Sequence, residues 1–326
     1  MISRYLAFGS LLWACGLTAA SATATVAPPS VDAIEEVQIS GERPGPGLWK
    51  VSRPGHTLYI LGTLTPLPKK VTWRSREVEN VLARAQLLIP ERASVSVKAG
   101  PIMAIRLYAE WRHARENAGD AKLAQVLPPD LYRRFRALRD KYAPHNSGME
   151  ERRPLLAAQA LYSKAVDAVG LTSKNTVGES VVKLAKKLRV PVADIEQRVE
   201  DPRAVLADFS KISARAEQEC LSATVARLET DLGAMRDRAT AWSIGDVGAL
   251  RTQPGIDQEN ACWGALVTAP RIAQMRAESE ALWFNAVVKS LQNNVTSIAV
   301  APISRLFERD GVLAKLQAKG YTVTAP

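Results

Sequence analysis

Histidine is scarce in this chain of 326 residues, which contains only His56, His113 and His145. No two of them have the spacing of a metal-binding pair. Transition metals prefer imidazole, thiolate and carboxylate ligands, so the sequence disfavours a site built on several histidines. The Gly-x-Ser-x-Gly motif of serine hydrolases is also absent. One Ser-x-x-Lys occurs at 180–183, but on an amphipathic helix and without the other motifs of serine acylases.

Cysteine is equally rare, and its first occurrence, Cys15, lies in an apolar N-terminal stretch. Residues 1–24 are typical of a secretion signal, with Arg4, an apolar run over 7–17 and small residues at the cleavage site. The run is shorter than the ~20 residues of a spanning helix, and no later run is long enough. Residues 12–15 loosely resemble a lipoprotein box, which leaves anchoring through Cys15 as the alternative to plain cleavage. The sequence therefore predicts a periplasmic or secreted protein.

Removal of a signal leaves two cysteines, Cys220 and Cys262. An even count in an exported chain favours one disulfide bond over two buried free thiols. Closing so long a loop restricts the unfolded chain by about 3–4 kcal/mol in the entropy model.

The formal net charge is +10, but the basic residues are scattered and mostly alternate with acids. The interleaving of aromatic and basic residues used by single-strand binders is missing, so we expect no nucleic-acid partner. The charge is better explained by solvated helix faces, with weak attraction to anionic lipid or polysaccharide as a minor alternative.

Residues 25–46 are rich in Pro, Ala, Ser and Gly and are typical of a flexible leader. The first ordered unit reads as strands at 48–52 and 57–64, a helix over 73–85, and a strand over 86–90 that is followed by Glu91.

A long helical middle follows, and the chain closes with a second unit that contains strands. We expect helices over 101–117, 129–142, from 154, over 178–188, over 202–235 as one or two helices, and over 270–292. A short strand over 190–195 ends at Glu196, and strands over 296–301 and 321–324 flank a last helix through Val312 and Leu316. This order predicts an α+β fold, with a mixed β-sheet formed by the N- and C-terminal units and a large helical middle section.

The order of several short segments carries a family resemblance. They are Leu48-Trp49-Lys50-Val51, Leu58 to Thr63, the strand that closes on Glu91, Ala241 to Asp246, and Asp310 to Val323. In this order and spacing the chain resembles the TraB/PrgY/GumN family, most closely its exported GumN-type bacterial members, with the matching domain over 47–326. The resemblance implies a mixed sheet with a helical lid and a metal-dependent hydrolase ancestry, shared with secreted metalloproteases of animals.

That family carries its chemistry on two Gly-x-x-His motifs and a glutamate. The first motif falls on residues 62–65, where Gly62 and Thr63 are kept and Thr65 replaces the histidine. The second falls on residues 301–304, where Ser304 replaces the histidine and Ala301 the glycine. The glutamate corresponds to Glu91.

Two further positions follow from the same resemblance. Glu196 corresponds to an acidic position at a strand end, and Arg276 to an arginine before the penultimate strand. We expect Gly62, Thr63, Glu196 and Arg276 to contribute to binding in the cleft.

Neutral hydroxyls are poor ligands for a transition metal, so we expect the ancestral divalent metal to be lost and no cofactor to be needed. The first hypothesis is a non-catalytic envelope protein that binds a peptide or an envelope polysaccharide. The second is a hydrolase with a remodelled site that uses Glu91 with Thr65 or Ser304. A hydroxyl nucleophile needs a base within reach, and helix capping or backbone bonding explains Thr65 and Ser304 equally well.

Overall fold

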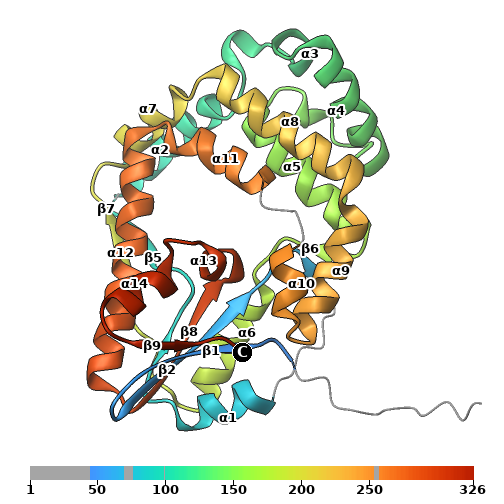
Figure 1. Cartoon of the computed structure of the whole chain (residues 1–326). Helices are drawn as coiled ribbons and strands as arrows, with labels where there is room; N and C mark the ends of the chain where they lie inside the picture. Colours follow the sequence, from blue (N-terminus) through green and yellow to red (C-terminus); the bar gives the residue numbers. More distant parts are fainter. Residues whose placement is uncertain (1–44, 70–75, 99, 253–256) are drawn as a thin grey trace, which may run out of the picture. The chain divides into compact units, whose positions relative to one another are not determined.

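The computed structural model describes residues 45–69, 76–98, 100–252 and 257–326 (Figure 1). The predicted signal over 1–24 and nearly all of the predicted leader lie outside the described residues. Gly45 and Pro46, the last two positions of the predicted leader, are buried.

A mixed five-stranded sheet is built from the two ends of the described chain, in the strand order β4-β8-β2-β1-β9. The strands are β1 (Leu48–Arg53), β2 (His56–Thr63), β4 (Leu88–Ile89), β8 (Thr296–Pro302) and β9 (Thr322–Thr324). Strand β1 is antiparallel to β2 and β9, whereas β2 and β4 both run parallel to β8. The predicted α+β fold with a sheet formed by N- and C-terminal units is confirmed.

The central strands are apolar on both faces, as expected for parallel strands that are covered on both sides. Ile60 and Leu61 of β2 and Ile298 and Val300 of β8 are fully buried. Helices α1 (Arg76–Arg84), α6 (Thr176–Lys187) and α12 (Pro270–Asn293) contribute apolar side chains to the same core. The amphipathic pattern of each helix explains this, because its buried residues recur every three or four positions.

The helical middle has a second hydrophobic core, centred on α4, α5, α8 and α11. Its helices are α2 (Pro101–Ala114), α3 (Leu123–Val126), α4 (Pro129–Tyr142), α5 (Pro154–Ala168), α7 (Pro202–Ser210), α8 (Ala214–Thr230), α9 (Leu232–Ser243), α10 (Val247–Thr252) and α11 (Asp257–Val267). Four of them begin with proline, which is favoured in the first helical turn because it lacks only a hydrogen-bond donor that the helix does not use. None of the described helices combines the length and apolarity that crossing a membrane requires.

Two features join the helices to one another and to the sheet. The predicted bond between Cys220 of α8 and Cys262 of α11 is present, with 4.4 Å between the Cα atoms. Helix α12 carries Trp283 and Val287 in the core of the sheet, while Ile272 near its start packs on the helical core. Figure 1 shows α12 running alongside the sheet towards α7 and α11.

Three predicted elements differ from the structure. Residues 190–195 form only an isolated bridge from Val192 to Leu88, and the strand β7 (Glu196–Val199) begins where the predicted strand was expected to end. It pairs with β5 (Ser94–Val97), which was not predicted. Residues 202–235, predicted as one or two helices, are divided among α7, α8 and the start of α9. The last predicted helix is divided into two, α13 (Ile303–Phe307) and α14 (Val312–Ala318).

Candidate functional site

The carboxyl ends of three parallel strands meet at one edge of the sheet. Strand β2 ends at Thr63, which is in register with Pro302 at the end of β8. Strand β4 ends at Ile89, two residues before Glu91. Because β4 and β2 flank β8, side chains that follow these strands are brought to a common edge, the usual place for a ligand in parallel sheets.

A carboxylate and a hydroxyl make direct contact at this edge. Thr63 Oγ1 donates a hydrogen bond to Glu91 Oε2 over 2.5 Å and lies 3.3 Å from the carbonyl oxygen of Ala301. A hydroxyl has one proton to donate, so the shorter contact with the charged group is favoured. The Glu91 side chain is only 6% exposed. Arg92 Nε, on a well-exposed side chain, lies 3.6 Å from Glu91 Oε1 and adds little in water.

Two tryptophans from the helices hold the backbone beside this pair. Trp242 Nε1 of α9 donates to the carbonyl oxygen of Gly62 over 2.7 Å, and Trp283 Nε1 of α12 donates to that of Pro90 over 3.0 Å. Gly62 must be small, because a Cβ atom there would lie 2.8 Å from the ring of Trp49 and 3.1 Å from Ile303. The ends of β2 and β4 are therefore fixed by side chains distant in the sequence.

Thr65 and Ser304, the two positions that the sequence resemblance aligns with histidines, are placed differently from Thr63. Thr65 is exposed and precedes a cis peptide bond to Pro66. Ser304 is half-buried in α13. Within the described part of the chain, no hydrogen bond joins either side chain to Glu91.

Glu196 and Arg276 make their contacts elsewhere. Glu196 is the first residue of β7 and is exposed; a hydrogen bond from Ser96 is the main cause that lowers its carboxyl pKa, followed by one from Arg198. Arg276 of α12 pairs with Glu280 over 3.1 Å and lies 4.7 Å above the ring of Trp263. Among the described residues, neither Glu196 nor Arg276 contacts Thr63 or Glu91.

The donors at the sheet edge do not fit a transition metal. One carboxylate, Glu91, is already bound to a neutral hydroxyl, and hydroxyls replace the imidazoles that the family resemblance implies. His56 lies at the start of β2, where its Nδ1 is 2.8 Å from the carbonyl oxygen of Asn294, and His113 belongs to α2. Over the described ranges, no cluster of three or more His, Cys, Asp or Glu side chains is arranged to hold a metal ion.

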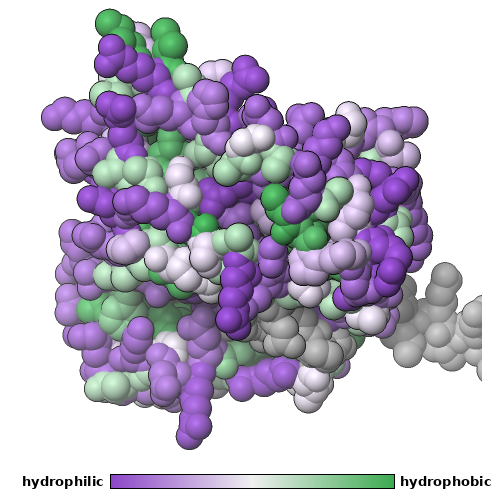
Figure 2. All heavy atoms as spheres, turned by 90° about the horizontal axis from the view of Figure 1, so that it is seen from above, coloured by the Kyte–Doolittle hydropathy of each residue, from purple (hydrophilic) through white to green (hydrophobic). Residues whose placement is uncertain are grey.

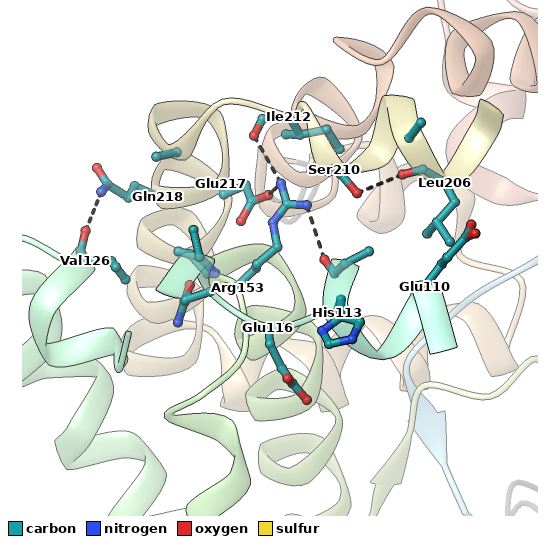
Figure 3. Close-up of a pocket in the computed structure, with 16 residues that line it drawn as sticks. Glu110, His113, Glu116, Val126, Arg153, Leu206, Ser210, Ile212, Glu217 and Gln218 are labelled. Carbon is teal, nitrogen blue, oxygen red and sulfur yellow. Dashed lines mark hydrogen bonds and ion pairs between the residues drawn. The ribbon is translucent and has the colours of Figure 1, made fainter. Parts of the chain in front are cut away.

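A cavity of about 640 Å³ lies in the helical half, between α2, α5, α7 and α8 (Figure 3). Arg153 projects into it and donates to the carbonyl oxygens of Phe209, Ile212 and Ala114, and it pairs with the buried Glu217. Burial is the main cause that raises the pKa of Glu217, while Arg153 opposes the rise. These contacts occupy the guanidinium, so Arg153 joins the helices instead of presenting a free charge to a ligand.

The sequence analysis paired Glu91 with Thr65 or Ser304 and named Thr63 only as a binding residue. In the structure the hydroxyl in contact with Glu91 is that of Thr63, the last residue of β2. The signal was the strand end itself, because Thr63 is the last position in register with β8.

Fold and site define an α+β protein whose parallel strands end at an enclosed carboxylate–hydroxyl pair. Residues 47–325 match the TraB/PrgY/gumN family, and the chain belongs to that family. No curated protein and no solved structure matches the chain.

Proposed function

We propose that this protein is a non-catalytic member of its family that binds a peptide or a glycan where β4, β8 and β2 end. The observation that carries the proposal is the contact between Glu91 and Thr63. The family resemblance places Glu91 among the residues that carry the family's chemistry, and here its carboxylate is enclosed and accepts from a neutral hydroxyl. A carboxylate held in this way can accept a hydrogen bond from an amide or a sugar hydroxyl of a ligand.

The chemistry of the other two positions supports loss of metal-dependent hydrolysis. A bound metal activates water by lowering its pKa to about 7. Thr65 and Ser304 are uncharged and poor ligands, so the residues that would have to hold such an ion are not suited to it.

The cellular setting of the proposal is the periplasm of a Gram-negative bacterium. The predicted signal over 1–24 supports this setting, and the bond between Cys220 and Cys262 is consistent with an oxidising compartment. An envelope polysaccharide or a peptide is then the ligand expected, and attachment through Cys15 is the alternative to a freely soluble form.

The second candidate function is hydrolysis by a remodelled site that uses Glu91 with Thr65 or Ser304. It is favoured by the burial of Glu91, since an enclosed carboxylate can act as a general base. A base must lie within hydrogen-bond reach of the nucleophile. Since Thr63 is the hydroxyl in contact with Glu91, the binding function is preferred.

Elemental analysis and activity assays on the purified full chain separate the two functions. We expect less than one equivalent of transition metal, no cleavage of labelled casein, and binding of casein peptides or an acidic exopolysaccharide that Glu91→Gln weakens. Glu196→Gln is the matched control, because Glu196 is an exposed carboxylate outside the edge. Stoichiometric metal, or cleavage abolished by Glu91→Gln alone, would overturn the binding proposal.

A further inference from the structure

Helix α2 has an apolar face that no described element covers. None of its fourteen residues is buried. Ile102, Ile105 and Tyr108 are 69%, 71% and 66% exposed. Such values are high for large apolar side chains, which normally lose most of their surface on folding. Figure 2, which views the protein from above, shows hydrophobic side chains at the surface among hydrophilic ones.

The exposed face of α2 is opposite the one that packs. At 3.6 residues per turn, the half-buried residues Met103, Leu107 and Ala114 share one side, on which α2 contacts α7. Ile102 and Ile105 lie on the other side, and Tyr108 lies at its margin. Val95 and Val97 of β5, the strand that precedes the helix, are also unusually exposed, at 58% and 47%.

The charged side chains that α2 and the end of β5 contribute to this face are basic. Arg106 and Arg112 of α2 are exposed on the same side as Ile102 and Ile105, and Lys98 is exposed at the end of β5. Glu110 is the one acidic residue in the sequence of α2. It lies on the packed side, half-buried, and pairs with Arg203 of α7 over 2.6 Å.

We propose that α2, with the exposed valines of β5, is a docking surface for an anionic lipid bilayer. A helix that combines large apolar side chains with Arg and Lys lies in the plane of the headgroups, burying its apolar face and attracting anionic lipid. At fourteen residues, α2 is too short to span a bilayer and suits this parallel orientation. The net charge of +10 adds a longer-range attraction of the same sign.

Charge also favours a lipid surface over a second copy of the chain. In a two-fold dimer the same patch meets itself, so Arg106 and Arg112 of one copy would face their own equivalents. Like charges opposed across an interface are costly, and α2 has no acid on this face to offset them. An anionic bilayer complements both the apolar side chains and the cations.

Flotation of the full chain with vesicles tests the proposal. We expect binding to vesicles of phosphatidylglycerol and phosphatidylethanolamine, weaker binding to phosphatidylcholine, and release at high salt. The double variant Ile102→Gln/Ile105→Gln should lower the partition coefficient about tenfold or more, since each isoleucine loses its buried apolar area. Both side chains are exposed, so circular dichroism should show a folded protein.

Matched variants separate the contribution of the α2 face to vesicle binding from other contributions. The apolar N-terminal stretch is the same in all variants, so it cannot cause a difference between them. Val295→Gln removes an equally exposed apolar side chain elsewhere and should not change binding. Arg106→Gln/Arg112→Gln should weaken binding to anionic vesicles and leave binding to neutral ones unchanged. Equal flotation of the wild type and both α2 variants would overturn the proposal. So would a dimer, seen by sedimentation, that only the α2 variants dissociate.

Discussion

Glu91 and Thr63 form a contact in which each residue depends on the other. The glutamate side chain is nearly enclosed, and its Oε2 accepts from the Thr63 hydroxyl at 2.5 Å. An enclosed carboxylate without a donor pays a desolvation penalty, so the hydroxyl stabilises the edge even if no ligand binds.

Replacement of Thr63 by valine should therefore destabilise the protein. The change keeps the shape of the side chain but removes the donor to Glu91, and we expect the free energy of unfolding to fall by about 1–3 kcal/mol. Urea denaturation measures this loss. Thr63→Ser keeps the hydroxyl and is the control, and equal stability of the two variants would show that the hydrogen bond contributes nothing.

At this scale the sequence brings Glu91 and Thr63 to the same region but does not predict that their side chains are in contact. The spacing of residues 62–65 matches a family motif and so draws attention to Thr65. The chain leaves the sheet edge after Thr63, and Thr65 is exposed before the cis bond to Pro66. Where a strand ends depends on its pairing with β8, which is far away in the sequence, so local pattern does not determine it.

Strand β2 and the elements around it depend on close packing at Gly62. Two side chains, Trp49 and Ile303, approach the position where a Cβ atom would lie. The indole of Trp242 also takes the Gly62 carbonyl oxygen as its acceptor. The glycine thus lets β1, β2 and α13 meet at the edge that carries the site.

Gly62→Ala should lower the free energy of unfolding by about 1–3 kcal/mol, because overpacking forces neighbours to shift. Thermal or urea denaturation provides the measurement. Gly233→Ala is the matched control: nothing lies within 4 Å of its added Cβ in α9, so alanine there should stabilise the helix by up to about 1 kcal/mol. A Gly62→Ala protein as stable as the wild type would contradict the close contact.

The contact between α7 and α12 predicts a dependence on pH. A hydrogen bond from Arg271 is the main cause that lowers the pKa of Asp208 from its ordinary value of 3.8. In acid the unfolded chain then binds more protons than the folded one, so the stabilisation present above about pH 3.8 is lost as the pH falls through the folded value.

Asp208→Asn should accordingly be less stable than the wild type at neutral pH, and the difference should shrink as the pH falls below about 3.8. Urea midpoints of the two proteins between neutral pH and about pH 3 give the test. Arg271→Gln should reproduce the profile. A difference that does not change with pH would mean that the pair contributes no linked proton binding.

Elements with strong local signals are predicted better than those without. Helix α4 is found with its bounds because Pro129 marks its start and apolar residues recur at helical spacing. The prediction of a strand over 190–195 is wrong because a short apolar run can form a buried loop as well as a strand. Strands β5 and β7 have four residues each and exist only because they pair, which local sequence does not reveal.

The described chain has two main hydrophobic cores, one around the sheet and one among the helices, and α12 contributes to both. The disulfide lies in the helical core, between α8 and α11. The sheet core has no covalent bond of this kind within the described residues. The two cores should therefore respond differently to reduction.

Cys220→Ser/Cys262→Ser should lower the stability of the helical core by about 3–4 kcal/mol, given a separation of 42 residues. Hydrogen exchange should show faster exchange in α8 and α11, while β2 and β8 keep their protection. The wild type treated with reductant is the control and should behave like the double variant. Equal loss of protection in β2 and β8 would show that the cores unfold as one cooperative unit.

The pairing of β2 with β8 also constrains how the chain is made. Residues 57–63 have their parallel partner in residues 296–302, so a growing polypeptide presents an apolar, unpaired strand edge until residues 296–302 have been synthesised. Contacts between residues this distant in sequence form slowly, and an apolar strand edge favours aggregation until it is paired. Production of this protein should therefore benefit from slow translation or low temperature, and fragments that stop before residue 296 should be recovered mainly as insoluble material.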